Sequence, residues 1–203
     1  MEEDSCSIPE LERFFKPRNV AVIGASSNPK KIGYKTFNNL VNGGFTGGMY
    51  PVNLEGEDVC GQKGYKNIGE IPVDIDLALI CIPAKFVNQE LIECGNKGVP
   101  FVVIISSGFK EIGNYELEEE IVETARKYNI RILGPNVFGM IYTPVNLNAQ
   151  FGNEKVLAGN VAIITQSGSL GIALMDRVFQ EGIGVSALTS VGNKADLSDE
   201  EIL

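Results

Sequence analysis

Continuous apolar runs alternate with amphipathic segments along this chain of 203 residues. Two runs, Leu77–Ile82 and Phe101–Ser106, are apolar at nearly every position, which is typical of strands buried on both faces of a parallel sheet. Alternation of such strands with helical segments predicts an α/β fold, a parallel sheet covered by helices. The predicted strands of this part are Val20–Gly24, Met49–Val52, Leu77–Ile82, Phe101–Ser106, Arg131–Leu133 and Met140–Tyr142.

Three segments between these strands have helical periodicity. The clearest is Tyr115–Tyr128, which has apolar residues at three- and four-residue spacing. It has glutamates at its start and basic residues at its end, as the helix dipole favours. We expect its glutamate run to be a solvated helix face. The predicted helices are Gly33–Val41, Phe86–Asn96 and Tyr115–Tyr128.

The periodicity fails around Pro144–Gly159, where Gly, Asn and Pro accumulate, and we predict a domain boundary there. Residues 1–150 then form the first domain and residues 151–203 the start of a second. Two strands and one helix cannot bury a core alone, so we expect a fragment, or a missing segment supplied by another chain. The second unit is predicted as strand Val161–Thr165, helix Leu170–Glu181, strand Val185–Ser190 and a last helix capped by Ser198.

Composition narrows the classes of partner. A hydrophobic content of 44% and a charged content of 21% indicate a globular protein. The net charge of −9 disfavours nucleic acid, and the small basic cluster Lys30, Lys31 and Lys35 suits one phosphorylated cofactor. The acidic N-terminus has no long apolar segment after it, so we expect no signal peptide, no membrane partner and a cytoplasmic protein.

The chain has no histidine and four cysteines. The missing histidine removes most acid–base, zinc and phosphotransfer chemistry. No two cysteines form a C-x-x-C pair, so we expect free thiols and no metal site, with Cys81 as a small core residue. The cysteines are Cys6, Cys60, Cys81 and Cys94.

The first candidate site is the turn Gly24-Ala25-Ser26-Ser27, which follows an apolar strand and precedes a helix. Such a turn leaves N–H groups unpaired at the positive end of the helix dipole, where anions bind. Only the first glycine of the dinucleotide fingerprint is in place, and Pro51-Val52-Asn53 supplies no acid for a ribose, which disfavours a nicotinamide dehydrogenase. A plain turn with surface lysines is the alternative.

A second turn, Gln166-Ser167-Gly168-Ser169, repeats this pattern and predicts a second phosphate site. It lacks the first glycine of a serine-hydrolase elbow, and without histidine a serine triad is disfavoured. Three further segments lie at predicted strand ends, where ligands bind in open parallel sheets, although each could be an ordinary turn. They are Ile82-Pro83-Ala84, Ser106-Ser107-Gly108 and Gly134-Pro135-Asn136.

Six motifs in this order resemble the NDP-forming acyl-CoA synthetases, most nearly the ADP-forming acetyl-CoA synthetases. The alpha subunit of succinyl-CoA synthetase is a more distant relative. The resemblance implies a Rossmann-like coenzyme A (CoA) binding domain followed by the start of a flavodoxin-like ligase domain. The motifs are Val22–Ser26, Tyr50–Asn53, Ile82–Ala84, Ser106–Phe109, Gly134–Asn136 and Gln166–Ser169.

The resemblance also implies site residues. The first turn would hold the CoA phosphates, the later strand ends would line the rest of CoA, and Asn136 would lie near the thiol. The implied CoA-binding residues are Gly24, Ala25, Ser26, Ser27, Lys31, Gly33, Asn53, Ile82, Pro83, Ala84, Ser106, Ser107, Gly108 and Asn136. The implied phosphate-binding residues are Gln166, Ser167, Gly168 and Ser169. A further set, Asn193, Lys194 and Asp196, fits either a family loop near the phosphate or a plain surface loop.

Two positions depart from the family pattern. Gly47-Gly48 stands where relatives often carry a lysine, so phosphate contacts would be lost or would pass to Lys30 or Lys31. Ile172 stands where the succinate enzyme carries a tyrosine, which disfavours a dicarboxylate substrate.

The implied reaction converts acyl-CoA, ADP and phosphate to acid, CoA and ATP through a phosphorylated histidine. By the family's order that histidine follows the end of this chain, so the chain holds no catalytic residue and is expected to be inactive alone. ADP or ATP and magnesium would bind outside the chain, on an ATP-grasp domain or beta subunit. The alternative is a non-catalytic CoA-binding regulatory module, free-standing or fused to an acetyltransferase.

Overall fold

The computed structural model describes residues 8–202. The sequence-based expectations for Cys6 and for the acidic N-terminus lie outside the described residues. No helix in residues 8–202 is both long enough and apolar enough to cross a membrane.

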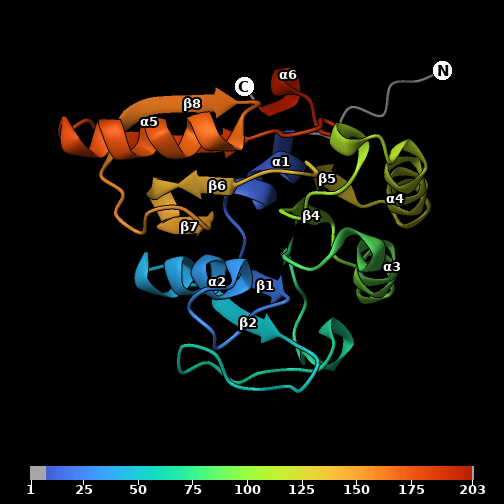
Figure 1. Ribbon diagram of the computed structural model, residues 1–203. Coiled ribbons are helices and arrows are strands. Elements are labelled where there is room, and N and C mark those ends of the chain that lie inside the picture. The colour runs from blue at the N-terminus through green and yellow to red at the C-terminus, as the bar shows by residue number, and fades with distance from the viewer. Residues whose placement is uncertain (1–7, 203) are drawn as a thin grey trace.

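The first sheet has five parallel strands in the order β2-β1-β3-β4-β5 (Figure 1). The predicted parallel sheet is confirmed, although β3 and β4 end two residues earlier than predicted. The strands are β1 (Asn19–Ile23), β2 (Gly48–Val52), β3 (Leu77–Ile80), β4 (Phe101–Ile104) and β5 (Arg131–Leu133).

Helices cover both faces of this sheet. Alternate strand residues point to opposite faces: Val20 and Leu79 share a core with Leu40 of α2 (Ile32–Asn42). Residues on the other face pack against α3 (Val87–Lys97) and α4 (Tyr115–Tyr128). The remaining short turns are 3-10 helices at Ile68–Glu70, Ala84–Phe86, Lys110–Ile112 and Thr143–Val145.

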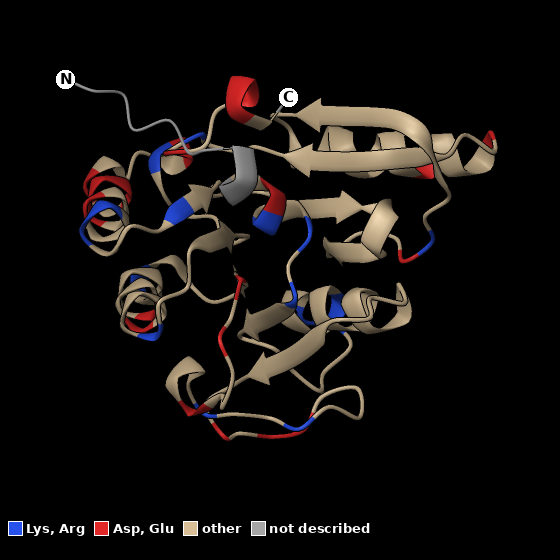
Figure 2. Cartoon of the chain, turned by 180° about the vertical axis from the view of Figure 1, so that it is seen from behind, with Lys and Arg blue, Asp and Glu red and all other residues tan. Residues whose placement is uncertain are grey.

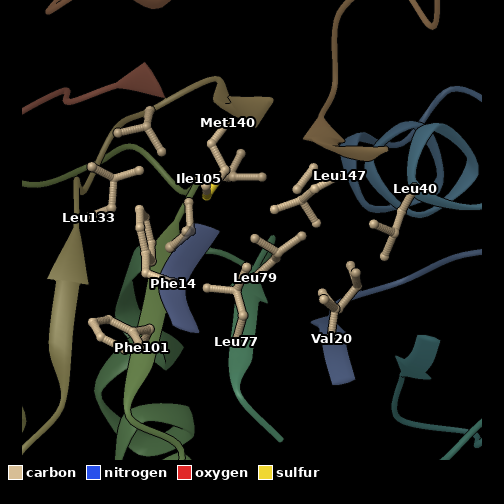
Figure 3. Packing of buried hydrophobic residues seen from close by; sticks show 14 of the residues in the cluster. Phe14, Val20, Leu40, Leu77, Leu79, Phe101, Ile105, Leu133, Met140 and Leu147 are labelled. Carbon is tan, nitrogen blue, oxygen red and sulfur yellow. The ribbon is translucent and has the colours of Figure 1, made fainter. Parts of the chain in front are cut away.

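Helix α1 (Ile8–Phe15) was not predicted. Its Phe14 is fully buried and its ring lies 5.4 Å from that of Phe101. Figure 3 shows Phe14 beside Phe101, Leu133 and Ile105, so α1 closes one end of the core.

The second sheet has four strands in the order β7-β6-β9-β8. The expectation that Met140–Tyr142 joins the parallel sheet is wrong, because this strand runs antiparallel to β7 and β9. Residues 139–150 form a hairpin around the turn Thr143–Val145, and the first strand of this hairpin pairs with the later strand β9. The strands are β6 (Gly139–Tyr142), β7 (Leu147–Gln150), β8 (Ala158–Thr165) and β9 (Val185–Ser190).

The two sheets pack against each other through one hydrophobic core. One face of the second sheet is covered by α5 (Gly168–Gln180). From the other face, Met140 and Leu147 join the core of the first sheet, next to Leu79 and Leu40 (Figure 3). The last helix, α6 (Asp199–Ile202), follows β9. The predicted division at residue 150 falls within the second sheet, because β6 lies before it and β9, which pairs with β6, lies after it.

Charged side chains lie mainly on helices and loops, and the strands carry few of them (Figure 2). The expected solvated face of α4 is confirmed for Glu116, Glu119 and Glu120, which are exposed. Glu118 is a correction, because it is 6% exposed and forms an ion pair with Lys110 at 2.7 Å.

Candidate functional site

A cavity of about 730 Å³ lies at the carboxyl ends of β3 and β4, where ligands bind in open parallel sheets. Its wall contains residues from both predicted sets. The strand ends supply Ile82, Pro83, Ser106, Ser107 and Asn136, and the second turn supplies Gln166, Ser167, Gly168 and Ser169. The fold therefore brings the second turn, which the sequence placed in another domain, against the strand ends of the first sheet.

The first turn differs from expectation in its hydrogen bonds. The N–H groups of Gly24 and Ala25 both donate to the carbonyl oxygen of Val52, at 2.9 and 3.1 Å. The Ser26 hydroxyl accepts from the N–H of Asn28 at 3.1 Å. The N–H groups of Gly24 and Ala25 are therefore already paired, and a bound anion would need hydrogen-bond donors from the helix that follows the turn.

That helix presents its uncapped end beside the turn. Lys31 occupies the N-cap position of α2 and its side chain makes no capping hydrogen bond. The first amides of α2 therefore remain available to an anion. Ile32, the first residue of the helix, lines the cavity, while Lys30 and Lys31 are exposed beside it.

Nine of the predicted CoA-binding residues do not line the cavity. Asn53 accepts from the N–H of Glu57 at 2.9 Å and donates to the Glu57 carbonyl at 2.8 Å, so its side chain closes its own loop. The others belong to the first turn, to the start of α2 and to positions next to lining residues in the chain. The nine are Gly24, Ala25, Ser26, Ser27, Lys31, Gly33, Asn53, Ala84 and Gly108.

Hydrogen bonds join the strand-end segments to one another. The Ser106 hydroxyl donates to the carbonyl oxygen of Ile82 at 2.5 Å. The Asn136 N–H donates to the Ser106 carbonyl at 3.0 Å, and Asn136 has a φ of 61°, a conformation that Asn tolerates better than most residues. Asn136 Nδ2 donates to Asn193 Oδ1 at 3.4 Å. These bonds fix the cavity floor in one shape.

The second turn is the N-terminus of α5. Ser167 is its N-cap, and the Ser167 hydroxyl accepts from the N–H of Leu170 at 3.3 Å and lies 3.1 Å from the Ser169 hydroxyl. Gln166 Nε2 donates to the carbonyl oxygen of Gly192 at 3.2 Å. The turn directs two hydroxyls and the positive end of a helix into the cavity, which suits a phosphate.

Apolar residues form the rest of the wall, and among them only Ile172 was connected with a ligand from the sequence, as the position that disfavours a dicarboxylate substrate. The Phe138 and Phe151 rings lie 6.3 Å apart at an angle of 76°. Phe138 follows the Gly134-Pro135-Asn136 motif closely, which could have indicated it, whereas Phe151 lies in the segment predicted as a boundary. The others are Ile32, Ile105, Val137, Ile172 and Cys81. All the described lining residues are uncharged.

The described cysteines are free, as expected, at positions 60, 81 and 94. Cys81 belongs partly to the core and partly to the cavity wall. Burial raises the pKa of the Cys81 thiol to about 12, against a smaller opposing effect of its hydrogen bond to Thr36. In residues 8–202, no three His, Cys, Asp or Glu residues group in a way that could hold a metal ion.

Two family models match the chain. The one described as "CoA binding domain" matches residues 18–143. The one described as "Succinyl-CoA ligase like flavodoxin domain" matches residues 158–203.

The chain is also similar to whole proteins. It is 55% identical over 199 residues to "Acetate--CoA ligase [ADP-forming] I subunit alpha" of Pyrococcus furiosus, covering 95% of this chain and 43% of that protein. It is 26% identical over 148 residues to "Succinate--CoA ligase [ADP-forming] subunit alpha 1" of Archaeoglobus fulgidus, covering 72% of this chain and 49% of that protein. The chain therefore spans less than half the length of these relatives.

A solved structure from Ca. Korarchaeum cryptofilum is similar over the same region. It is described as "dinucleotide forming Acetyl-coenzyme A synthetase 1 in complex with phosphate and ADP" and superposes with a TM-score of 0.93 at 50% identity. The match covers 95% of this chain and 41% of that one. The Rossmann-like domain followed by the start of a flavodoxin-like domain, as expected from the sequence, is confirmed.

Proposed function

This chain belongs to the family of CoA-binding domains, and from that premise we propose that it is the CoA-binding part of an ADP-forming acetate–CoA ligase. The resemblance to the NDP-forming acyl-CoA synthetases is confirmed by the similarities above. One observation carries the proposal: the strand-end segments of the CoA-binding domain and the phosphate-type turn of α5 line a single cavity. Such a cavity can hold the thiol end of CoA beside a phosphate.

The proposed reaction converts acetyl-CoA, ADP and phosphate to acetate, CoA and ATP. This chain contains no histidine, so a phosphorylated histidine must come from outside it. The nucleotide would bind an ATP-grasp domain or beta subunit, together with magnesium, the usual companion of nucleotide phosphates. The solved relative described with phosphate and ADP supports a role for both in the family.

The uncapped N-terminus of α2, with Ser26, Ser27 and Lys31 beside it, would receive the CoA phosphates. Pro83, Ala84, Ser107 and Gly108 would line the rest of the cofactor, with Asn136 near the thiol. The turn Gln166–Ser169 would receive phosphate. In this proposal residues 1–150 form the CoA-binding domain and residues 151–203 begin the ligase domain of a cytoplasmic enzyme.

A non-catalytic regulatory module is the alternative, and it is not favoured. Relatives that are 40% to 55% identical over at least 95% of this chain are named as ADP-forming acetate–CoA ligases. A nicotinamide dehydrogenase lacks support too, because the residue directly after β2 is Asn53, where a ribose-binding enzyme of that class carries an acidic residue.

Calorimetric titration of this chain with CoA, with NAD as the competing ligand class, tests the proposal. We expect saturable CoA binding and no NAD binding. Ser26→Glu should abolish CoA binding, because it places a carboxylate where the CoA phosphates are proposed to lie. Asn96→Glu, on an exposed position of α3, adds the same charge away from the cavity and should bind as the unchanged chain does.

Two results would contradict the proposal. NAD binding without CoA binding would favour a dehydrogenase. Absence of CoA binding by both this chain and the full-length gene product would reject the CoA site itself.

A further inference from the structure

The side chain of Asn193 joins elements from both sheets. It lies in the loop after β9 and is 8% exposed. Asn193 Nδ2 donates to Glu111 Oε2 at 2.7 Å and to Glu118 Oε2 at 2.8 Å. One amide group thus serves two carboxylates, one from the 3-10 helix Lys110–Ile112 and one from α4, which covers the first sheet.

Glu111 continues this connection to the CoA side of the cavity. Its Oε1 accepts from the N–H of Gly108 at 2.5 Å and from that of Phe109 at 3.2 Å. Burial would raise the pKa of Glu111, but the hydrogen bonds from Gly108 and Asn193 outweigh it and leave the pKa lowered. The loop that holds Ser107 and Gly108 is therefore tied through an ionised carboxylate to Asn193.

Gly192 continues the connection to the phosphate side. Its carbonyl oxygen accepts from Gln166 Nε2 at 3.2 Å. A Cβ atom on Gly192 would overlap the carbonyl oxygen of Pro135, so the loop lies directly against the strand-end segment. On the same side, the Asn193 N–H donates to the Pro135 carbonyl at 2.9 Å and Asn193 Oδ1 accepts from Asn136.

Resting on the proposed function, we infer that Asn193 is a positioning residue. It fixes the position of the loop at Ser107 and Gly108 relative to the turn Gln166–Ser169. It does not line the cavity, and it acts through Glu111 and through the backbone of Gly192.

The chemistry of the amide allows a specific test. Asn193→Asp places a third carboxylate against Glu111 and Glu118, of which Glu118 is paired with Lys110, while the neighbouring Lys194 is paired with Asp199. Like charges raise the pKa of the introduced acid by one or more units above its usual value of about 3.9. When protonated, the acid has the shape of Asn and can donate one hydrogen bond again.

CoA affinity is measured by calorimetry at about pH 8 and about pH 5 for the unchanged chain, Asn193→Ala and Asn193→Asp. We expect Kd to rise about tenfold for both variants at the higher pH, because both lose the hydrogen bonds that Asn193 donates to Glu111 and Glu118. At the lower pH Asn193→Asp should recover most of its affinity relative to the unchanged chain, and Asn193→Ala should not. Asn88→Ala removes a similar Asn–Glu hydrogen bond on α3 and should bind normally.

Amide hydrogen exchange of the ligand-free chain separates this inference from the proposed function. Asn193→Ala should speed exchange at both Gly108 and Phe109, whether or not CoA binds. If the unchanged chain binds no CoA, the proposed function fails and this exchange decides the positioning role. Unchanged exchange at both amides, or Asn193→Asp that behaves as Asn193→Ala at both pH values, would overturn the inference.

Discussion

A Cβ atom on Gly33 would overlap the carbonyl oxygen of Gly24, because the first turn of α2 lies directly against the turn after β1. Gly24 itself has a φ of 87° and no room for a side chain beside the Cys81 carbonyl. Both glycines were expected from the sequence to bind CoA. Their contact shows that they also set how closely the helix end approaches the sheet.

Gly33→Ala should therefore destabilise the chain by about 2 kcal/mol, since a methyl group in a filled space forces the backbone apart. The same shift moves the end of α2, so CoA affinity should fall as well. Urea denaturation and calorimetry check the two effects. Gly69→Ala is the control, because its Cβ would meet only the end of the Asn67 side chain, at 3.1 Å. A Gly33→Ala variant as stable as Gly69→Ala would contradict the close packing.

Ser167 combines helix capping with proposed phosphate binding. Ser167→Ala should cost about 1 kcal/mol of stability, because the N–H of Leu170 loses its capping partner, whereas Ser167→Gly should cost only a few tenths. Ser169→Ala leaves the cap intact and should leave the free energy of unfolding within about 0.5 kcal/mol. Denaturation midpoints of the three variants give this order. A Ser169→Ala loss as large as that of Ser167→Ala would show that Ser167 is not the cap.

Asp76 ties the end of α1 to the start of β1. The Asp76 carboxylate is 1% exposed and accepts from Arg13 at 2.7 Å and from the N–H groups of Arg18 and Asn19 at 2.8 and 3.2 Å. Burial would raise the pKa of Asp76, but the hydrogen bonds from Arg13 and Arg18 outweigh it and leave the pKa lowered. The stabilisation is therefore present above about pH 4 and is lost as pH falls through the folded-state pKa.

Asp76→Asn should lower the free energy of unfolding by about 2 kcal/mol at neutral pH. The difference from the unchanged chain should shrink at pH values below about 4. Urea denaturation at neutral and acid pH measures both. Asp74→Asn changes an exposed neighbour and should alter stability by less than about 0.5 kcal/mol at either pH. A difference for Asp76→Asn that is constant with pH would contradict the role of its ionised form.

Cys81 should resist alkylation although it lines the cavity. A thiol pKa of about 12 leaves only about one part in ten thousand as thiolate near pH 8, and the thiolate is the reactive form. Mass spectrometry after iodoacetamide treatment should find Cys81 unmodified in the folded chain and modified in urea. Labelling of folded Cys81 at the rate seen in urea would show an exposed, ionised thiol.

The parallel sheet was predictable because strands such as β3 and β4 are apolar at every position, a pattern that burial on both faces requires. Strand β7 was missed because it buries polar side chains. Asn148 and Gln150 are 4% and 1% exposed, and they donate to the carbonyl oxygens of Glu154 and Asn153. Local sequence gives no sign that these amides have partners, so the segment resembles a loop.

The motifs at the strand ends identified the polar part of the cavity, since each follows a predicted strand. The link from Glu111 to Asn193 was not predictable, because it joins residues 82 positions apart. The aromatic wall of Phe138 and Phe151 depends likewise on how the hairpin of residues 139–150 folds back. Long-range contacts of this kind follow from the packing of two sheets, which periodicity does not describe.

The pairing of Met140 in β6 with Thr189 in β9 bears on the order in which a ribosome delivers this chain. The β6–β7 hairpin emerges first and can close locally, but one edge of β6 keeps unpaired backbone groups until β9 has been synthesised. During that interval the nascent chain carries an open strand edge beside a first sheet whose five strands have all been synthesised. A pause in translation that keeps β9 inside the ribosome after the hairpin has emerged would prolong this state, and we expect it to favour aggregation of the nascent chain.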